Sequence, residues 1–214
     1  MQRAARGCGR KREEITLVAV SKKFPAERLA TAYAAGLREF GENYVQEFAE
    51  KRPALGSLSG ARYHLIGHLQ SNKARIAVGL FQVVETVDSA KLLQRLNQAA
   101  GERGVTIEAM MEVKLSGEES KSGAGAEEIP AILEAAALCT HVSLTGLMTI
   151  PPWSEDPERA RPYFRQLAAL ARQYNLPKLS MGMSGDLETA IEEGATVVRV
   201  GTALFGKRPK PTTA

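Results

Sequence analysis

The hydrophobic residues of the chain fall into short runs that alternate with amphipathic stretches. Eight runs have the length and apolar content of strands, and they lie at 15–21, 38–41, 62–66, 82–87, 105–114, 142–150, 178–183 and 196–200. Apolar residues at helical spacing predict helices near 26–36, 43–52, 71–79, 89–101, 126–138, 158–174 and 185–193. Because strands that alternate with helices pair in parallel through right-handed crossovers, eight such units predict a closed (β/α)8 barrel.

A doubly wound open sheet is the alternative fold, although no GxGxxG motif follows the first predicted strand. The barrel needs a helix over the seam between its first and last strands, and residues 202–214, with their prolines and lysines, do not predict one. We therefore expect residues 1–14 to form a short helix or tail near that seam. The whole chain is then a single barrel domain with a basic C-terminal tail at 207–214.

The composition narrows the classes of protein that fit the sequence. The 44% of hydrophobic and 24% of charged residues are typical of a soluble globular protein. No apolar run approaches the roughly 18 residues of a membrane span, and the apolar segment behind the basic N-terminus is too short for a signal peptide. We expect a cytoplasmic protein, and nothing in the sequence requires more than a monomer.

The cysteines and histidines form no recognisable metal motif. Cys8 and Cys139 are far apart in the sequence, which is typical of reduced thiols rather than a disulfide framework. His64 and His68 are four residues apart, but on an extended stretch this spacing does not bring the two rings together. We therefore expect no metal site.

The positive charge is concentrated at the two ends of the chain. Of the 28 lysines and arginines, eight lie in 1–12 and 207–214, which contain no acidic residue. The remaining 20 basic residues face 24 acidic ones, so the body between the ends carries a net charge of −4. Such ends are more typical of solvated tails than of a groove for phosphates, and nucleic acid is not an expected partner.

The candidate chemistry lies at the carboxyl ends of the predicted strands, where barrels place their active sites. Lys22 follows the buried first strand directly. Ser184 follows the seventh strand at the start of a helix, and Gly201 and Thr202 follow the eighth strand. Since barrels commonly hold a phosphate between the loops after strands seven and eight, these three residues predict a phosphate site.

Arg199 lies at the end of the eighth strand, and its side chain points either into the barrel or outward. If it points inward, a lysine, an arginine and a phosphate site lie on neighbouring strands. This set suggests pyridoxal phosphate, which forms a Schiff base with a lysine while the arginine meets the pyridine nitrogen. A phosphosugar enzyme would instead need a carboxylate base, for which Glu42 and Glu112 are candidates. Glu112 is equally placed to form an ion pair with Lys22 or Lys114.

Two polar residues follow the second and third strands. Asn43 and Ser71 each precede or begin a predicted helix, and helix capping is the simplest interpretation of both. Asn43 also lies at the rim where a cofactor would bind.

Seven motifs occur in order along nearly the whole chain: AVSK at 19–22, FGENYVQE at 40–47, HLIGHLQSNK at 64–73, SKSG at 120–123, GLMTIP at 146–151, LSMGMS at 179–184 and VRVGTALFG at 198–206. With these motifs the sequence resembles the pyridoxal phosphate homeostasis proteins. The resemblance implies the barrel fold of the alanine racemase N-terminal domain and pyridoxal 5'-phosphate bound through Lys22. It also implies that the cofactor contacts the residues Asn43, Ser184, Arg199, Gly201 and Thr202.

An arginine at the pyridine nitrogen cannot easily keep that nitrogen protonated, which weakens the ring as an electron sink. A two-base racemase would also need a second acid or base, and the resemblance to alanine racemase implies that an additional β domain supplies it. We therefore expect a carrier or regulator of pyridoxal phosphate that acts in vitamin B6 homeostasis and only indirectly on amino-acid pools. Apo pyridoxal phosphate enzymes are its candidate partners. The alternative is an amino-acid racemase of low activity that uses Lys22 as one base.

Overall fold

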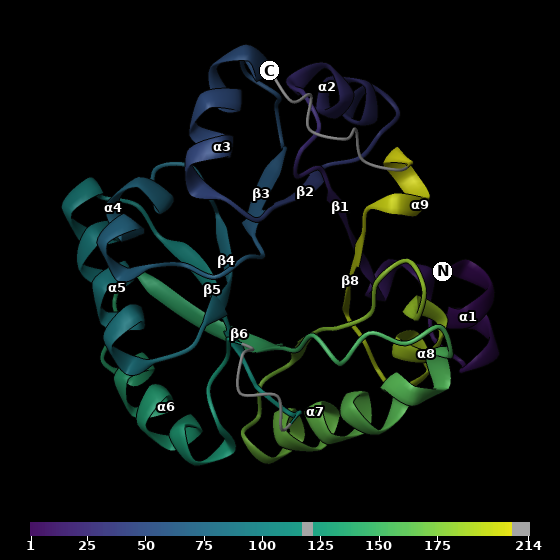
Figure 1. Cartoon of the computed structure of the whole chain (residues 1–214). Coiled ribbons are helices and arrows are strands. Elements are labelled where there is room, and N and C mark those ends of the chain that lie inside the picture. The colour runs from purple at the N-terminus through teal and green to yellow at the C-terminus, as the bar shows by residue number, and fades with distance from the viewer. Residues whose placement is uncertain (117–121, 207–214) are drawn as a thin grey trace.

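The computed structural model describes residues 1–116 and 122–206. Eight parallel strands form a closed barrel in sequence order (Figure 1). The strands are β1 Thr16–Val20, β2 Glu39–Glu42, β3 Arg62–Leu65, β4 Val83–Val87, β5 Ile107–Glu112, β6 Val142–Met148, β7 Lys178–Ser180 and β8 Val197–Val200. The predicted barrel is confirmed, and the alternative of an open sheet is wrong. The basic tail expected at 207–214 and part of the motif at 120–123 lie outside the described residues.

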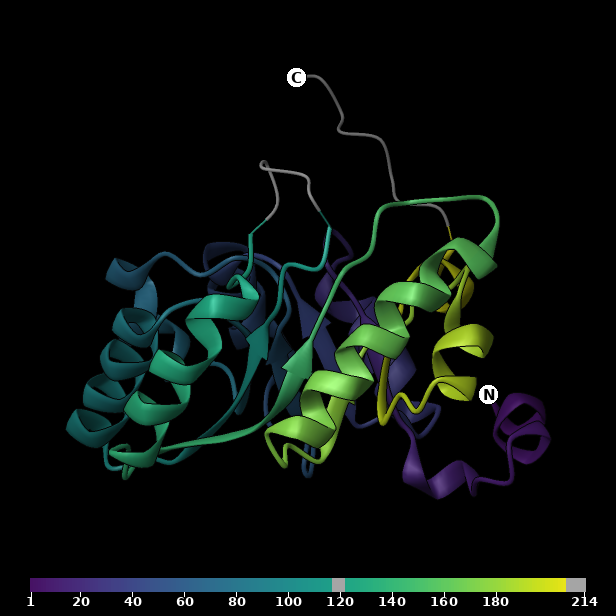
Figure 2. The same cartoon turned by 90° about the horizontal axis from the view of Figure 1, so that it is seen from below.

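The helices surround the strands, as Figures 1 and 2 show. They are α1 Gln2–Gly7, α2 Ala26–Ala34, α3 Val45–Lys51, α4 Ala74–Ala77, α5 Ala90–Arg103, α6 Ile129–Ala137, α7 Arg161–Gln173, α8 Leu187–Glu192 and α9 Thr202–Phe205. Short 3-10 turns lie between them: η1 Arg12–Glu14, η2 Arg52–Leu55, η3 Ser71–Lys73, η4 Ala126–Glu128 and η5 Pro157–Ala160.

The longest helix shows how the sequence sets these elements. Ser89 caps α5 by accepting a hydrogen bond from Leu92 N, and Gly104 ends it in the left-handed conformation. The apolar stripe predicted for this helix is buried, and its members are Leu92, Leu93, Leu96, Ala99 and Ala100. The helix therefore packs its apolar face on the barrel and leaves its charged face in solvent.

The seam of the barrel joins the first strand to the last. β1 pairs with β8 from Thr16 opposite Val197 to Ala19 opposite Val200. Beside this seam α1 lies next to α8 (Figure 1). Arg10, which follows α1, donates hydrogen bonds from Nη1 to carbonyl oxygens at the end of α8 and in the loop before β8. Along the described residues, no helix is both long and apolar enough to cross a membrane.

Candidate functional site

The carboxyl ends of the strands open on a cavity of about 460 Å³. This volume is within the range of about 300–1,000 Å³ that is usual for small-molecule sites. The residues that line it include all six that the sequence singled out, namely Lys22, Asn43, Ser184, Arg199, Gly201 and Thr202. They come from four strand ends, those of β1, β2, β7 and β8, and the closed barrel brings them together. We call this space the main cavity.

Lys22 follows β1 after the buried Ser21, at the rim of the main cavity. Three hydrogen bonds hold Ser21, two through its backbone and one through its side chain. Ser21 N donates to Gly41 O at 2.9 Å, the Ser21 hydroxyl donates to Glu42 Oε1 at 2.7 Å, and Lys51 Nζ donates to Ser21 O at 3.2 Å. These bonds fix the turn from which the Lys22 side chain extends.

Glu42 belongs to this support. Its carboxylate forms an ion pair with Lys51, 2.9 Å from Oε1 to Nζ, and burial raises its pKa although Lys51 and Ser21 lower it. Glu42 is not one of the described residues that line the main cavity. The hypothesis that Glu42 faces a substrate as a base is therefore wrong, because its buried carboxylate is held by Ser21 and Lys51 away from the residues that line the cavity.

Asn43 and Ser71 do not cap helices. The N-cap of α3 is Tyr44 and that of η3 is Gln70, and neither helix has a side-chain cap bond. The capping prediction is wrong for both residues. Asn43 instead lines the main cavity, where its Oδ1 atom is buried and has no hydrogen-bond partner among the described residues. Since an unsatisfied buried polar atom is costly, this position is suited to a polar ligand.

The loops after β7 and β8 meet at Ser184. Its hydroxyl oxygen accepts a hydrogen bond from Ala203 N at 3.4 Å, so the two loops predicted to hold a phosphate are in contact. Gly182 has φ +92°, and a side chain there would come within 2.5 Å of the Ala190 Cβ atom. Gly201 is less constrained, because a Cβ atom there would only make ordinary contacts with Val20, at 3.4 Å.

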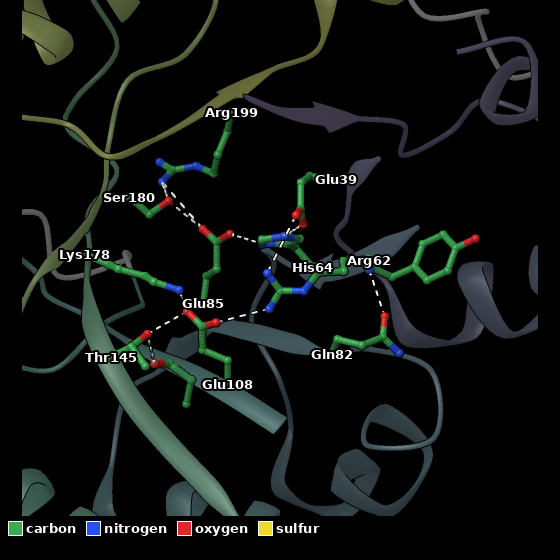
Figure 3. Close-up of polar contacts among 12 residues, drawn as sticks. Glu39, Arg62, His64, Gln82, Glu85, Glu108, Thr145, Lys178, Ser180 and Arg199 are labelled. Carbon is green, nitrogen blue, oxygen red and sulfur yellow. Dashed lines mark hydrogen bonds and ion pairs between the residues drawn. The ribbon is translucent and has the colours of Figure 1, made fainter. Parts of the chain in front are cut away.

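Arg199 points into the barrel and is almost fully buried. Its guanidinium donates from Nη1 to Ser180 Oγ at 2.6 Å and from Nη2 to Thr149 O at 2.8 Å. Glu85 Oε2 lies 4.0 Å from Nη1 and accepts a hydrogen bond from Ser180 Oγ at 2.5 Å. Figure 3 shows this cluster. A permanent cation is thereby held at the floor of the main cavity.

His64 continues the cluster on the far side of Glu85 (Figure 3). Its Nδ1 lies 2.6 Å from Glu85 Oε1, and its Nε2 lies 2.7 Å from Glu39 Oε2. Burial lowers the pKa of His64, but the hydrogen bonds to Glu39 and Glu85 outweigh this effect and raise the pKa to about 9. Burial raises the pKa of Glu85, yet His64 and Arg199 keep it below its usual range. In this cluster positive and negative groups therefore alternate, in the order Arg199, Glu85, His64 and Glu39.

Sequence reasoning missed this cluster. Glu85 stands within a strand whose residues are all buried, and His64 stands in β3 next to buried neighbours. An ionisable residue inside an apolar strand was the available signal, because a buried charge requires a partner.

Glu112, the last residue of β5, lines a second cavity of about 210 Å³. We call this cavity the annex. It shares Asn43, Ile66 and Ile150 with the main cavity and is also lined by His68, Glu112 and Lys114. Glu112 is 7% exposed, and it forms no side-chain hydrogen bond or ion pair with another described residue. The alternative of an ion pair for Glu112 is therefore wrong within this part of the chain.

The pKa of Glu112 reflects this isolation. Burial raises it to about 7, Arg199 lowers it in part, and Asp88 raises it further.

Within residues 1–116 and 122–206, no group of three or more His, Cys, Asp or Glu side chains lies close enough to hold a metal ion.

Comparison with known proteins identifies the family. The family model for the N-terminal domain of alanine racemase matches residues 3–209. The pyridoxal phosphate homeostasis protein of Aquifex aeolicus is 42% identical over an alignment of 214 positions. The alignment covers 97% of this chain and 93% of that protein. The chain belongs to the pyridoxal phosphate homeostasis protein family. Its member from Pseudomonas aeruginosa is 44% identical over 210 residues, with coverage of 97% and 91%.

Solved structures agree with this family membership. PipY of Synechococcus elongatus PCC7942, solved with PLP bound, has a TM-score of 0.83 and 42% identity, and the match covers 90% of this chain and 93% of PipY. An alanine racemase of Clostridium difficile 630 has a TM-score of 0.75 at 13% identity, and the match covers 98% of this chain and 56% of that one. At such low identity, the likeness to alanine racemase shows the fold alone.

Proposed function

We propose that this member of the pyridoxal phosphate homeostasis protein family binds pyridoxal 5'-phosphate in the main cavity and acts as its carrier or regulator. The observation that carries the proposal is that six residues from four separate strand ends line one cavity of suitable volume. The relatives support it, since they are named for pyridoxal phosphate homeostasis and PipY was solved with PLP bound.

The donor set of the main cavity fits this cofactor. When bound, pyridoxal phosphate supplies an aldehyde that reacts reversibly with a primary amine and a pyridine ring that withdraws electrons. Lys22 supplies the amine, and Arg199 supplies the cation for the pyridine nitrogen. The Ser184 and Thr202 hydroxyls, on two loops in contact, receive the phosphate. The unsatisfied amide of Asn43 receives a further polar group of the ring.

Arg199 favours holding the cofactor over catalysis with it. Its guanidinium is a very weak acid and is bound to Ser180 and to Thr149 O. It therefore orients the pyridine nitrogen without giving it a proton, and the ring stays a modest electron sink. We infer a cytoplasmic monomer that supplies cofactor to apo pyridoxal phosphate enzymes and so acts indirectly on amino-acid pools.

Replacement of Lys22 tests the anchor. The wild-type protein is expected to turn yellow with pyridoxal phosphate, and Lys22→Ala is expected to lose this absorbance while its melting temperature stays within a few degrees. Lys23→Ala is the matched control, because this neighbouring lysine does not line the described wall of the main cavity. Borohydride reduction followed by peptide mass mapping should place the pyridoxyl group on Lys22. An equally yellow Lys22→Ala protein would refute the anchor.

The alternative of a racemase has its own measurement. Cofactor-loaded protein is incubated with L-alanine or L-serine, and the D isomer is measured by chiral chromatography. We expect no sustained formation of the D isomer. Turnover that continues beyond one equivalent and disappears in Lys22→Ala would overturn the proposed carrier role in favour of the enzyme.

A further inference from the structure

The annex contains an ionisable group that the proposed cofactor site does not use. Glu112 is more than nine-tenths buried and lines the annex, yet it bonds to no other described side chain or backbone group through its carboxyl. The Glu112 carboxyl oxygens are not among the described buried side-chain atoms that lack a hydrogen-bond partner, so they are accessible from the annex. A carboxyl at a cavity wall that no described group engages is placed to accept a hydrogen bond from a cationic ligand.

A positive charge lies beside this carboxyl without neutralising it. Lys114 follows Glu112 by two residues on an extended stretch, where Val113 forms a bridge with Ala124. Residues two apart on an extended chain point to the same side, with about 6–7 Å between their Cα atoms. Both residues line the annex, and no ion pair joins them within the described residues.

We propose that the annex binds a small zwitterion, with its ammonium group on the Glu112 carboxylate and its carboxylate on Lys114. Among the described residues of the annex wall, Glu112 is the acidic side chain, which suits one ammonium group and provides too few ligands for a metal ion. His68 is already 3.4 Å from the Asp88 carboxylate and half-exposed, so Lys114 is the cation that remains for an anion. The volume of about 210 Å³ limits the ligand to a small molecule.

The annex adjoins the main cavity, so a ligand in the annex would lie beside a ligand in the main cavity. Asn43, Ile66 and Ile150 form a wall common to both cavities, so a bound zwitterion lies next to whatever fills the main cavity. The inference goes beyond the proposed cofactor function and does not depend on it, because none of the groups that bind the zwitterion is the anchor Lys22.

The charge of Glu112 should control the affinity of the annex for the zwitterion. The groups that face it are Arg199 from β8, Asp88 after β4, His68 after β3 and Lys114 beyond β5. With its pKa raised to about 7 by burial, Glu112 is mostly neutral at pH 6 and mostly ionised at pH 8. Because the ammonium group needs the carboxylate, binding should be about tenfold weaker at pH 6 than at pH 8.

The test uses cofactor-free protein labelled with 13C at glutamate carboxyl groups, so that no reaction with pyridoxal phosphate can occur. Glycine, methylammonium and acetate are titrated in turn while the Glu112 carboxyl signal is followed by NMR. Glycine combines the charged groups of the other two probes. We expect glycine to shift the signal with saturation and to lower the pKa of Glu112, methylammonium to do so more weakly, and acetate to leave it unchanged.

Substitutions at Glu112 and Lys114 test whether these two side chains bind glycine. Glu112→Gln, which keeps the shape, should assign the signal and abolish glycine binding, as measured by the glycine line width. Lys114→Gln should reduce the glycine affinity to that of methylammonium, and Ser122→Ala, at the exposed edge of the annex, should leave it unchanged. Equal effects of acetate and glycine, or no effect of glycine on wild-type protein, would overturn the inference. The pyridoxyl adduct on Lys22 would be unaffected by that result.

Discussion

At the residue scale, the charge of His64 contributes to the stability of the barrel. Its pKa is about 9 in the folded protein, compared with an ordinary value of 6.5. A group whose pKa is raised by folding stabilises fully below its unfolded pKa, and this stabilisation is lost as the pH rises through the folded pKa. The free energy of unfolding should therefore fall between about pH 6.5 and pH 9, by on the order of 3 kcal/mol.

His64→Gln should remove this dependence on pH. The variant should be less stable overall, because Glu85 loses its contact with the Nδ1 atom of His64 and Glu39 loses its contact with the Nε2 atom. Its free energy of unfolding, measured in urea at pH 6.5 and pH 9, should nevertheless differ little between the two conditions. His68→Gln, which changes a half-exposed histidine, should retain the slope of the wild type. A wild-type stability that rises toward pH 9 would contradict the assignment of a charged His64.

That the six candidate residues would line one cavity could be predicted from sequence, because each lies within two residues of the end of a predicted strand, and a strand end is a local property. Glu85 could not be assigned a partner in this way. Its partner Ser180, on β7, lies 95 residues away, and its partner His64, on the neighbouring strand β3, lies 21 residues away. Which strand positions point inward depends on closure and register, which one strand does not reveal. The inward direction of Arg199 was left open for the same reason.

At the scale of the elements, the loop from β7 to α8 depends on Gly182. Its φ of +92° is strained for other residues, and an added Cβ atom would lie 2.5 Å from Ala190 Cβ. Gly182→Ala should lower the free energy of unfolding by about 1–3 kcal/mol. It should also weaken the binding of pyridoxal phosphate, because the displaced loop carries Ser184.

Gly185→Ala is the matched control for stability in the same loop. Gly185 has no positive φ, and a Cβ atom there meets nothing within 4 Å. Thermal melts of the two variants should therefore separate, with a clear loss for Gly182→Ala and almost none for Gly185→Ala. Equal melting temperatures would show that the loop tolerates a side chain at either position.

Gly182 also explains one limit of the sequence prediction. The run 178–183 is apolar enough for a six-residue strand, but β7 ends at Ser180 because the chain leaves the extended conformation at Gly182. The helix predicted near 71–79 is likewise shorter, with η3 followed by the single turn α4. The alternation of elements, which determines the fold, survives such errors, since it depends on the order of the elements and not on their exact ends.

At the scale of the molecule, the barrel is closed by contacts between segments far apart in sequence. β1 and β8 pair directly, while α1 and the residues after it attach to α8. Arg10 Nη1 donates to Ala195 O at 2.8 Å and to Ile191 O at 3.1 Å. Because Ile191 O lies at the end of α8, the charged donor is favourable for the helix dipole as well, while the bond to Ala195 O ties the loop before β8. The N-terminal segment therefore secures the same α8 that follows the Ser184 loop.

Arg10→Ala should loosen this seam. The loss of two charge-assisted hydrogen bonds should lower the free energy of unfolding by about 2–4 kcal/mol, since each is worth about 1.5–3 kcal/mol and their effects are not fully additive. Hydrogen exchange should rise first in α1, α8 and the β1–β8 pairing, and least in β4 and β5 on the far side of the barrel. Arg6→Ala is the control, because Arg6 is exposed on α1. A uniform rise in exchange throughout the barrel would show that Arg10 supports the whole fold and not the seam alone.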